Sequence, residues 1–145
     1  MVELVFENQT EHHQWVEKFF VPIVGKTLAR ANLHKRQVEL GIQLVTPERS
    51  RELNVQYRQK DKPTDVLSFP LEETALEKYG ILPLGDIFIC PDVAVAQAAE
   101  TGTPIKEEMA RLVVHGLLHL LGYDHERSPE DEKKMIDLQE EILYG

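Results

Sequence analysis

The sequence has 145 residues, of which 42% are hydrophobic and 28% are charged, and this length and balance predict one globular domain over residues 1–145. No run reaches the roughly 18 apolar residues that a membrane-spanning helix needs, and a single cysteine, Cys90, excludes an internal disulfide, so we expect a cytoplasmic protein without a membrane partner. The formal net charge of −9 argues against a general affinity for nucleic acids, and we expect no DNA partner.

The elements are predicted from hydrophobic periodicity and from capping residues. Alternating apolar residues predict four strands, at residues 2–6, 38–45, 65–71 and 84–90. Helix-start signals predict five helices, which begin near Thr10, Thr46, Asp92, Thr103 and Ser128. Pro22 is expected to kink or interrupt the first helix. Residues 72–83 are less regular, and a short helical piece is predicted at residues 74–79.

This mixed order of elements predicts an α+β fold, in which about five helices cover a small mixed sheet of about four strands. The strands at residues 38–45 and 65–71 flank a single helix. That is enough for a crossover, so we expect part of the sheet to be parallel. The helix that begins at Thr103 is apolar almost all round, and we expect it to lie at the centre of the fold.

The central helix carries a candidate metal site. His115 and His119 are four residues apart, so they lie one turn apart on the same helix face. Gly122 is a typical left-handed helix stop, which lets the chain turn back and bring His125 to the first two histidines. Three histidines predict a zinc site with an open fourth position, the arrangement of catalytic zinc; the alternative is a set of core histidines. Imidazole ligands also accept nickel, copper and iron.

A zinc ion of this kind suits hydrolysis, because it can activate water or polarise a carbonyl or phosphoryl oxygen. The spacing resembles the metzincin pattern His-Glu-x-x-His-x-x-Gly-x-x-His at His115, His119, Gly122 and His125. The glutamate that serves there as general base is replaced by Gly116, which cannot accept a proton. Peptide hydrolysis by the usual route is therefore not expected.

The histidine segment also resembles the signature of the bacterial YbeY family. Residues 115–125 read HGLLHLLGYDH, and two further blocks fit the family in order and spacing: residues 53–70, LNVQYRQKDKPTDVLSFP, and residues 84–87, LGDI. The resemblance covers most of the chain. It implies a zinc-dependent endoribonuclease specific for single-stranded RNA, with one zinc ion per chain held by His115, His119 and His125.

The resemblance further implies a role in ribosomal RNA maturation, notably at the 3′ end of the small-subunit RNA, and in ribosome quality control. The implied partners are ribosomal RNA, a small-subunit ribosomal protein and the GTPase Era. The family's functional arginine corresponds to Arg58, and a guanidinium can bind phosphate bidentately or stabilise a charged transition state. An alternative role for Arg58 is to end a helix and neutralise its carbonyl end.

Other polar residues have two interpretations each. Asp86 either supports a histidine ligand or is a satisfied strand-edge acid, and Asp124 either orients His125 or belongs to the turn. Ser68 is expected to be a strand residue and Cys90 a core residue. Two rival functions also stay open: a zincin-like metalloprotease, and a non-enzymatic ribosome-assembly factor whose zinc is structural.

Overall fold

The computed structural model describes residues 2–71, 80–123 and 128–145, which contain four strands and five helices. In chain order these elements are β1 (Val2–Asn8), α1 (Glu17–Arg30), β2 (Gln37–Leu44), α2 (Pro47–Arg58), β3 (Val66–Pro70), β4 (Ile81–Ile89), α3 (Pro91–Thr101), α4 (Ile105–Leu120) and α5 (Pro129–Tyr144). The predicted α+β fold is confirmed. The helical piece predicted at residues 74–79 lies outside the described residues.

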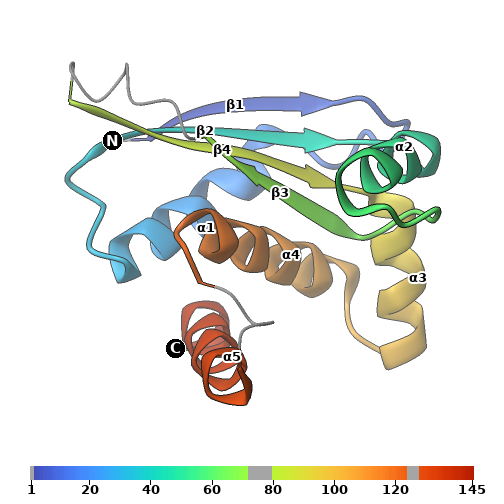
Figure 1. The fold of residues 1–145 in the computed structure, drawn as a ribbon. Helices are drawn as coiled ribbons and strands as arrows, with labels where there is room; N and C mark the ends of the chain where they lie inside the picture. Colours follow the sequence, from blue (N-terminus) through green and yellow to red (C-terminus); the bar gives the residue numbers. More distant parts are fainter. Residues whose placement is uncertain (1, 72–79, 124–127) are drawn as a thin grey trace.

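The sheet has the strand order β1-β2-β4-β3, with β1, β2 and β4 parallel and β3 antiparallel to β4. A partly parallel sheet is therefore confirmed. However, the strands on either side of α2 do not form the parallel pair, because β4 lies between β2 and β3 (Figure 1). Consecutive strands β3 and β4 pair antiparallel instead, as neighbouring strands in a chain commonly do.

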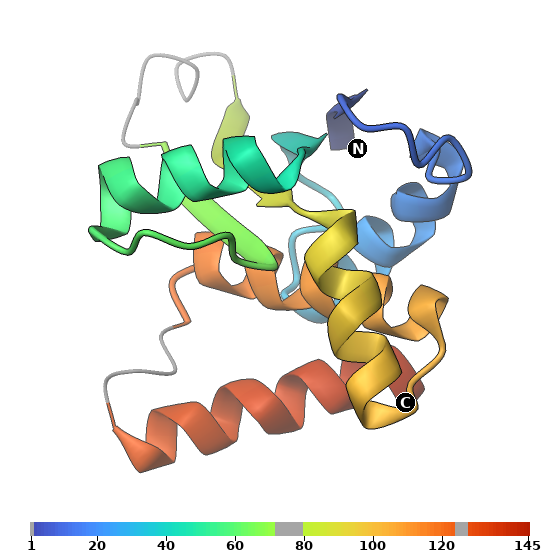
Figure 2. The same ribbon diagram turned by 90° about the vertical axis from the view of Figure 1, so that its right-hand side faces the viewer.

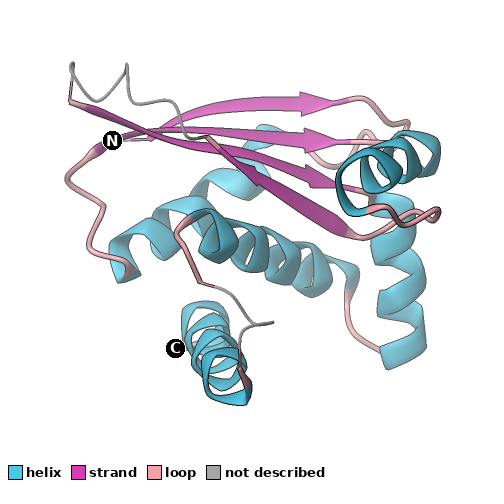
Figure 3. Ribbon diagram, in the orientation of Figure 1, coloured by secondary structure: helices cyan, strands magenta, loops and turns pink. Residues whose placement is uncertain are grey.

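Helix α4 lies at the centre of the fold, as predicted, and contacts α1, α3, α5, β3 and β4. Together with α1 it covers one face of the sheet, and α5 packs on the side of α4 that points away from the strands (Figures 1 and 3). Two apolar clusters stabilise these layers. The larger joins the sheet to α1 and α4, and the smaller joins α4 to α5 through the buried residues Val114, Leu118, Met135 and Ile142.

Several predicted helix starts depend on side-chain caps that the structure tests. The Thr46 hydroxyl accepts a hydrogen bond from the Arg49 backbone N–H (3.3 Å), and Ser128 accepts one from the Asp131 N–H (3.1 Å). These two caps are confirmed. Thr10 does not begin α1, because its hydroxyl bonds to Asn8 Oδ1 (2.7 Å) in a turn that precedes the helix by several residues.

Proline lies at the start of α3 and α4 and inside α1. Asp92 does not cap α3, whose N-cap is Cys90 with Pro91 in the first position. Pro104, rather than Thr103, is the N-cap of α4. Pro22 lies inside α1, which continues through it from Glu17 to Arg30 without interruption. No helix among the described residues is long and apolar enough to cross a membrane.

Candidate active site

An open cleft of about 870 Å³ lies between two walls that come from different parts of the chain. Helices α4 and α5 contribute residues to the first wall, and the end of α2, residues 64–65 and β3 contribute residues to the second. Figure 2 shows the arrangement of these elements, with α4 between α2 and α5. The lining residues are Tyr57, Arg58, Thr64, Asp65, Val66, Leu67, Ser68, Phe69, Glu108, Arg111, Leu112, His115, His119, Gly122, Tyr123 and Gln139. The cleft thus brings Arg58 and two of the three predicted zinc ligands to one cavity.

His115 and His119 lie on adjacent turns of α4 and both face the cleft, with their ring centroids 4.9 Å apart and the ring planes at 67°. The helix ends as the sequence predicts. Gly122 has φ +100°, and the Tyr123 N–H reaches back to the Leu118 carbonyl (3.0 Å), a left-handed C-terminal cap. The third predicted ligand, His125, lies outside the described residues. Within those residues, no group of three or more histidine, cysteine, aspartate or glutamate side chains could hold a metal ion.

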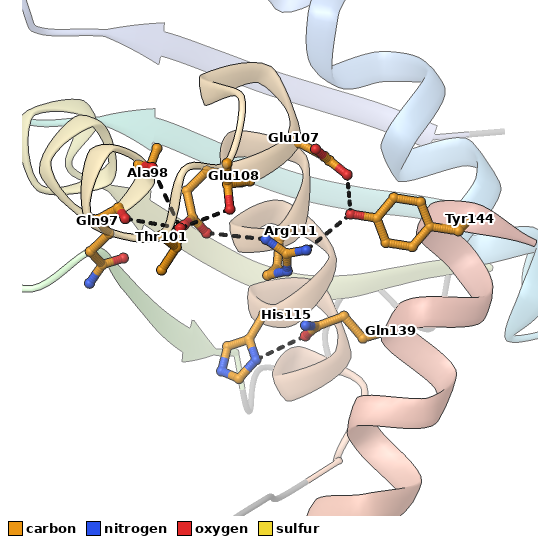
Figure 4. A network of polar contacts seen from close by, with 10 residues as sticks. Gln97, Ala98, Thr101, Glu107, Glu108, Arg111, His115, Gln139 and Tyr144 are labelled. Carbon is orange, nitrogen blue, oxygen red and sulfur yellow. Dashed lines mark hydrogen bonds and ion pairs between the residues drawn. The ribbon is translucent and has the colours of Figure 1, made fainter.

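One of the two histidines is oriented by a residue of α5. His115 Nδ1 lies 3.1 Å from the side-chain oxygen of Gln139, which is buried between α4 and α5 (Figure 4). Since an amide oxygen only accepts hydrogen bonds, Nδ1 carries the proton in this contact and Nε2 is the acceptor nitrogen. Metal-binding histidines are commonly held in this way, with one nitrogen donating to a neighbour and the other directed to the metal.

Gln139 was not recognised from the sequence as part of the site. The available signal was the position of an amide on the apolar face of α5, four residues after Met135 and three before Ile142, all three of them buried. Such a residue needs a polar partner. The sequence could not show that this partner is His115, which lies 24 residues earlier in the chain.

Gly116 faces the sheet, not the histidine cleft. A Cβ atom at this position would lie 2.9 Å from Ile87 Cγ2, 3.1 Å from Ser68 Oγ and 3.3 Å from Val66 Cγ2. Glycine therefore allows the close approach of α4 to β3 and β4, and a glutamate here would have no room. The Ser68 hydroxyl donates to the Gly116 carbonyl (3.0 Å), so Ser68 links the strand to the helix, consistent with its predicted structural role.

Arg58 is the last residue of α2 and lines the second wall of the cleft. The helix stops there because Gln59 adopts the left-handed conformation, with φ +56°. The loop that follows is tied to the helix by the buried Asn54, whose side-chain N–H donates to the Lys62 carbonyl (2.8 Å). Arg58 therefore ends a helix and also lines the cleft; its predicted contact with phosphate stays a prediction.

A second arginine lies in the cleft one turn before His115. Arg111 Nη2 donates to the Tyr144 hydroxyl (3.0 Å), and Arg111 Nη1 lies 3.7 Å from Glu108 Oε1 (Figure 4). The Tyr144 hydroxyl in turn donates to Glu107. Hydrogen bonding to Glu107 raises the pKa of Tyr144, so the phenol stays protonated as a donor. This network fixes α5 against α4 on the same side as Gln139.

Asp86 supports neither His115 nor His119, the two predicted ligands that the structure describes. Its neighbour Ile87 contacts the α4 side of the sheet, so Asp86 points to the opposite face, where its carboxylate occupies the space above Gly41. It is not a strand-edge acid either, because β4 is an interior strand. Burial raises the pKa of the Asp86 carboxyl.

Cys90 is buried at the start of α3 and does not line the cleft. Burial raises the pKa of its thiol, in agreement with a core role.

The chain is similar to a protein family, to curated proteins and to a solved structure. A profile of the endoribonuclease YbeY family matches residues 5–145. The proteins named endoribonuclease YbeY from Sulfurihydrogenibium sp. and Persephonella marina are 52% and 48% identical to this chain; they cover 97% and 99% of it, which correspond to 90% and 92% of their own lengths. The solution structure of TM1509 from Thermotoga maritima is 29% identical, covers 97% of this chain and 87% of its own, and superposes with a TM-score of 0.64.

Proposed function

The chain belongs to the endoribonuclease YbeY family, and on that premise we propose that it is a metal-dependent endoribonuclease that cuts single-stranded RNA. The observation that supports this proposal best is that one cleft has candidate metal ligands on one wall and an arginine on the other. His115 and His119 lie on the first wall, and Arg58 lies on the second. A cleft with metal-ligating groups opposite a permanent cation suits the cleavage of a phosphodiester.

We propose that His115, His119 and His125 hold one zinc ion. The residues present fit such an ion, because two imidazoles follow each other on adjacent turns and the Gln139 contact leaves His115 Nε2 as the acceptor nitrogen. A bound zinc ion supplies Lewis-acid polarisation and activation of water. Gln139 keeps the His115 ring in one orientation and one tautomer.

Arg58 supplies the substrate contact in this proposal. A guanidinium stays charged at any physiological pH and binds phosphate bidentately, so Arg58 can hold the scissile phosphate and stabilise negative charge that develops on it. The group that accepts the proton from the attacking water is not Gly116, which has no ionisable group. Glu108 lines the cleft and lies seven residues before His115, about 10 Å along the helix axis.

The cellular role that we propose follows from the family. It comprises maturation of ribosomal RNA at the 3′ end of the small-subunit RNA and ribosome quality control in the cytoplasm. The partners are ribosomal RNA, a small-subunit ribosomal protein and the GTPase Era. We propose that neither DNA nor a membrane is a partner. Cleavage assays that include single-stranded DNA test whether DNA is a substrate.

The decisive experiment compares cleavage of a single-stranded RNA by the wild type, Arg58→Ala and His119→Ala, with the metal content of each protein measured. We expect His119→Ala to lose both zinc and cleavage. Arg58→Ala should keep its zinc and lose cleavage on the order of 100-fold, as for loss of one transition-state donor. His34→Ala is the matched control, because His34 is exposed and does not line the cleft. Full cleavage by metal-free His119→Ala would contradict a catalytic role of the metal.

The product ends separate two routes of phosphodiester cleavage. We propose that water attacks phosphorus, which gives linear phosphate ends. Attack by the ribose 2′-hydroxyl would leave a 2′,3′-cyclic phosphate instead, and finding that end would overturn the water route.

The same protein preparation tests both rival functions. Casein cleavage that His115→Ala abolishes would favour a metalloprotease. Unfolding upon removal of the metal, combined with a zinc-loaded wild type that cuts no RNA, would favour an assembly factor with a structural zinc.

A further inference from the structure

Tyr57 is an exposed aromatic residue in the cleft, immediately before Arg58. We propose that its ring is a stacking platform for an unpaired base, and that this contact makes the cleft selective for single-stranded RNA. The inference rests on the proposed function and names a group that recognises the substrate. A stacked base on Tyr57 and a phosphate on Arg58 would belong to the same stretch of RNA.

Tyr57 combines high exposure with a place in the cleft, whereas Tyr144 is equally exposed but does not line the cleft. Tyr57 is 54% exposed and belongs to the last turn of α2. Tyr57 is a member of neither the larger nor the smaller core cluster. An exposed aromatic side chain in a cavity commonly marks a binding surface.

The ring is supported from behind by two further aromatic residues. Tyr57 and Phe69 have ring centroids 4.6 Å apart with the planes at 54°, and Phe69 and Phe88 have centroids 5.4 Å apart at 71°. Both phenylalanines are partly buried on the sheet. This backing fixes the ring in one position, so a base that stacks on it would not have to order a mobile side chain.

The position of Tyr57 in the chain couples stacking to phosphate binding. The left-handed Gln59 ends α2 directly after Arg58, and the bond from Asn54 to the Lys62 carbonyl holds the following loop. Tyr57 and Arg58 are therefore adjacent residues in the last turn of a helix whose end is fixed by these contacts. Stacking requires a base whose face is free, and a base inside a duplex has both faces covered by its neighbours. Aromatic platforms beside cationic grooves are the usual means by which proteins bind single strands without a fixed sequence.

The test uses the full chain with His119→Ala as background, so that RNA is bound but not cut. Short single-stranded RNAs carry one 2-aminopurine at successive positions, and its fluorescence falls when it stacks. We expect quenching at one position and a loss of affinity of about 5- to 150-fold for Tyr57→Leu, the range for one base–aromatic stack. Tyr57→Phe should keep both the quenching and the affinity. Val55→Ala, another exposed apolar residue of α2 outside the cleft, controls for changes in the helix.

The outcomes separate this inference from the function on which it rests. If the background protein binds no single-stranded RNA, the proposed function fails. If it binds RNA and Tyr57→Leu shows equal affinity and equal quenching, only the stacking platform is refuted. In the cleaving protein, Tyr57→Leu should raise KM far more than it lowers kcat, with unchanged zinc content. An equal loss of affinity for duplex RNA would contradict a role in strand selectivity.

Discussion

Replacing Gly116 by alanine adds one methyl group at the closest approach between α4 and the sheet. The new Cβ would lie 2.9 Å from Ile87 Cγ2 and 3.1 Å from Ser68 Oγ. Carbon atoms pack best at about 3.5–4.0 Å, so the helix would have to move away from the strand by roughly 0.6–1.1 Å or distort the Ile87 side chain. Ile87 is fully buried in the main core, which leaves it little room to yield.

Two opposing terms set the size of the effect. Alanine is better than glycine inside a helix by about 1 kcal/mol. Overpacking of a well-packed core costs about 1–3 kcal/mol. The net result is a loss of about 0–2 kcal/mol in the free energy of unfolding. Near the middle of that range, a chain of this size should melt about 2–4 °C lower.

Urea unfolding of two glycine variants measures this difference directly. Gly25 lies inside α1, and nothing lies within 4 Å of a Cβ built there, so Gly25→Ala should stabilise the protein by up to about 1 kcal/mol. Gly116→Ala should change the unfolding free energy in the opposite direction. If both variants are stabilised equally, the close approach of α4 to the sheet does not require glycine, and the physical explanation for the missing glutamate is wrong.

Three further predictions concern single contacts. Gln139→Leu removes the oxygen that accepts from His115, and zinc affinity in a chelator competition should fall about 10- to 100-fold; unchanged affinity would mean that the contact does not orient the ligand. Ser68→Ala removes the bond to the Gly116 carbonyl and should cost about 1 kcal/mol in urea, with zinc content unchanged. For Asp86, burial raises the pKa, so its folded form keeps the proton to higher pH, and stability is lost as the pH rises through the folded-state pKa. Asp86→Asn should therefore melt higher than the wild type near neutral pH but not below about pH 4, and a pH-independent difference would refute this explanation.

Local features of the site could be predicted from the sequence because they depend on residues within one or two turns. The spacing of His115 and His119 places them on one helix face, and it does so in the structure. Gly122 has the positive φ that its place after an apolar helix predicts. The caps at Thr46 and Ser128 are also contacts between residues three apart. The family resemblance was likewise a property of the sequence, and the comparisons confirm it.

The strand order depended on which elements meet in space. Insertion of β4 between β2 and β3 could not be predicted from the helix that separates the latter two, because either strand could pair with β2. For the same reason, the prediction that Asp86 lies at a strand edge was wrong. An interior strand buries a carboxyl that an edge strand would expose.

The sequence by itself determined the histidine pair, the end of its helix, and the absence of a base at Gly116. Only the tertiary structure decided why glycine stands there, which residue holds His115, and which wall of the cleft Tyr57 and Arg58 share. The physical reason is one of range. Helix geometry and capping act over a few residues and are encoded locally, whereas close packing and buried hydrogen bonds join residues far apart in the chain and exist only after the layers have assembled.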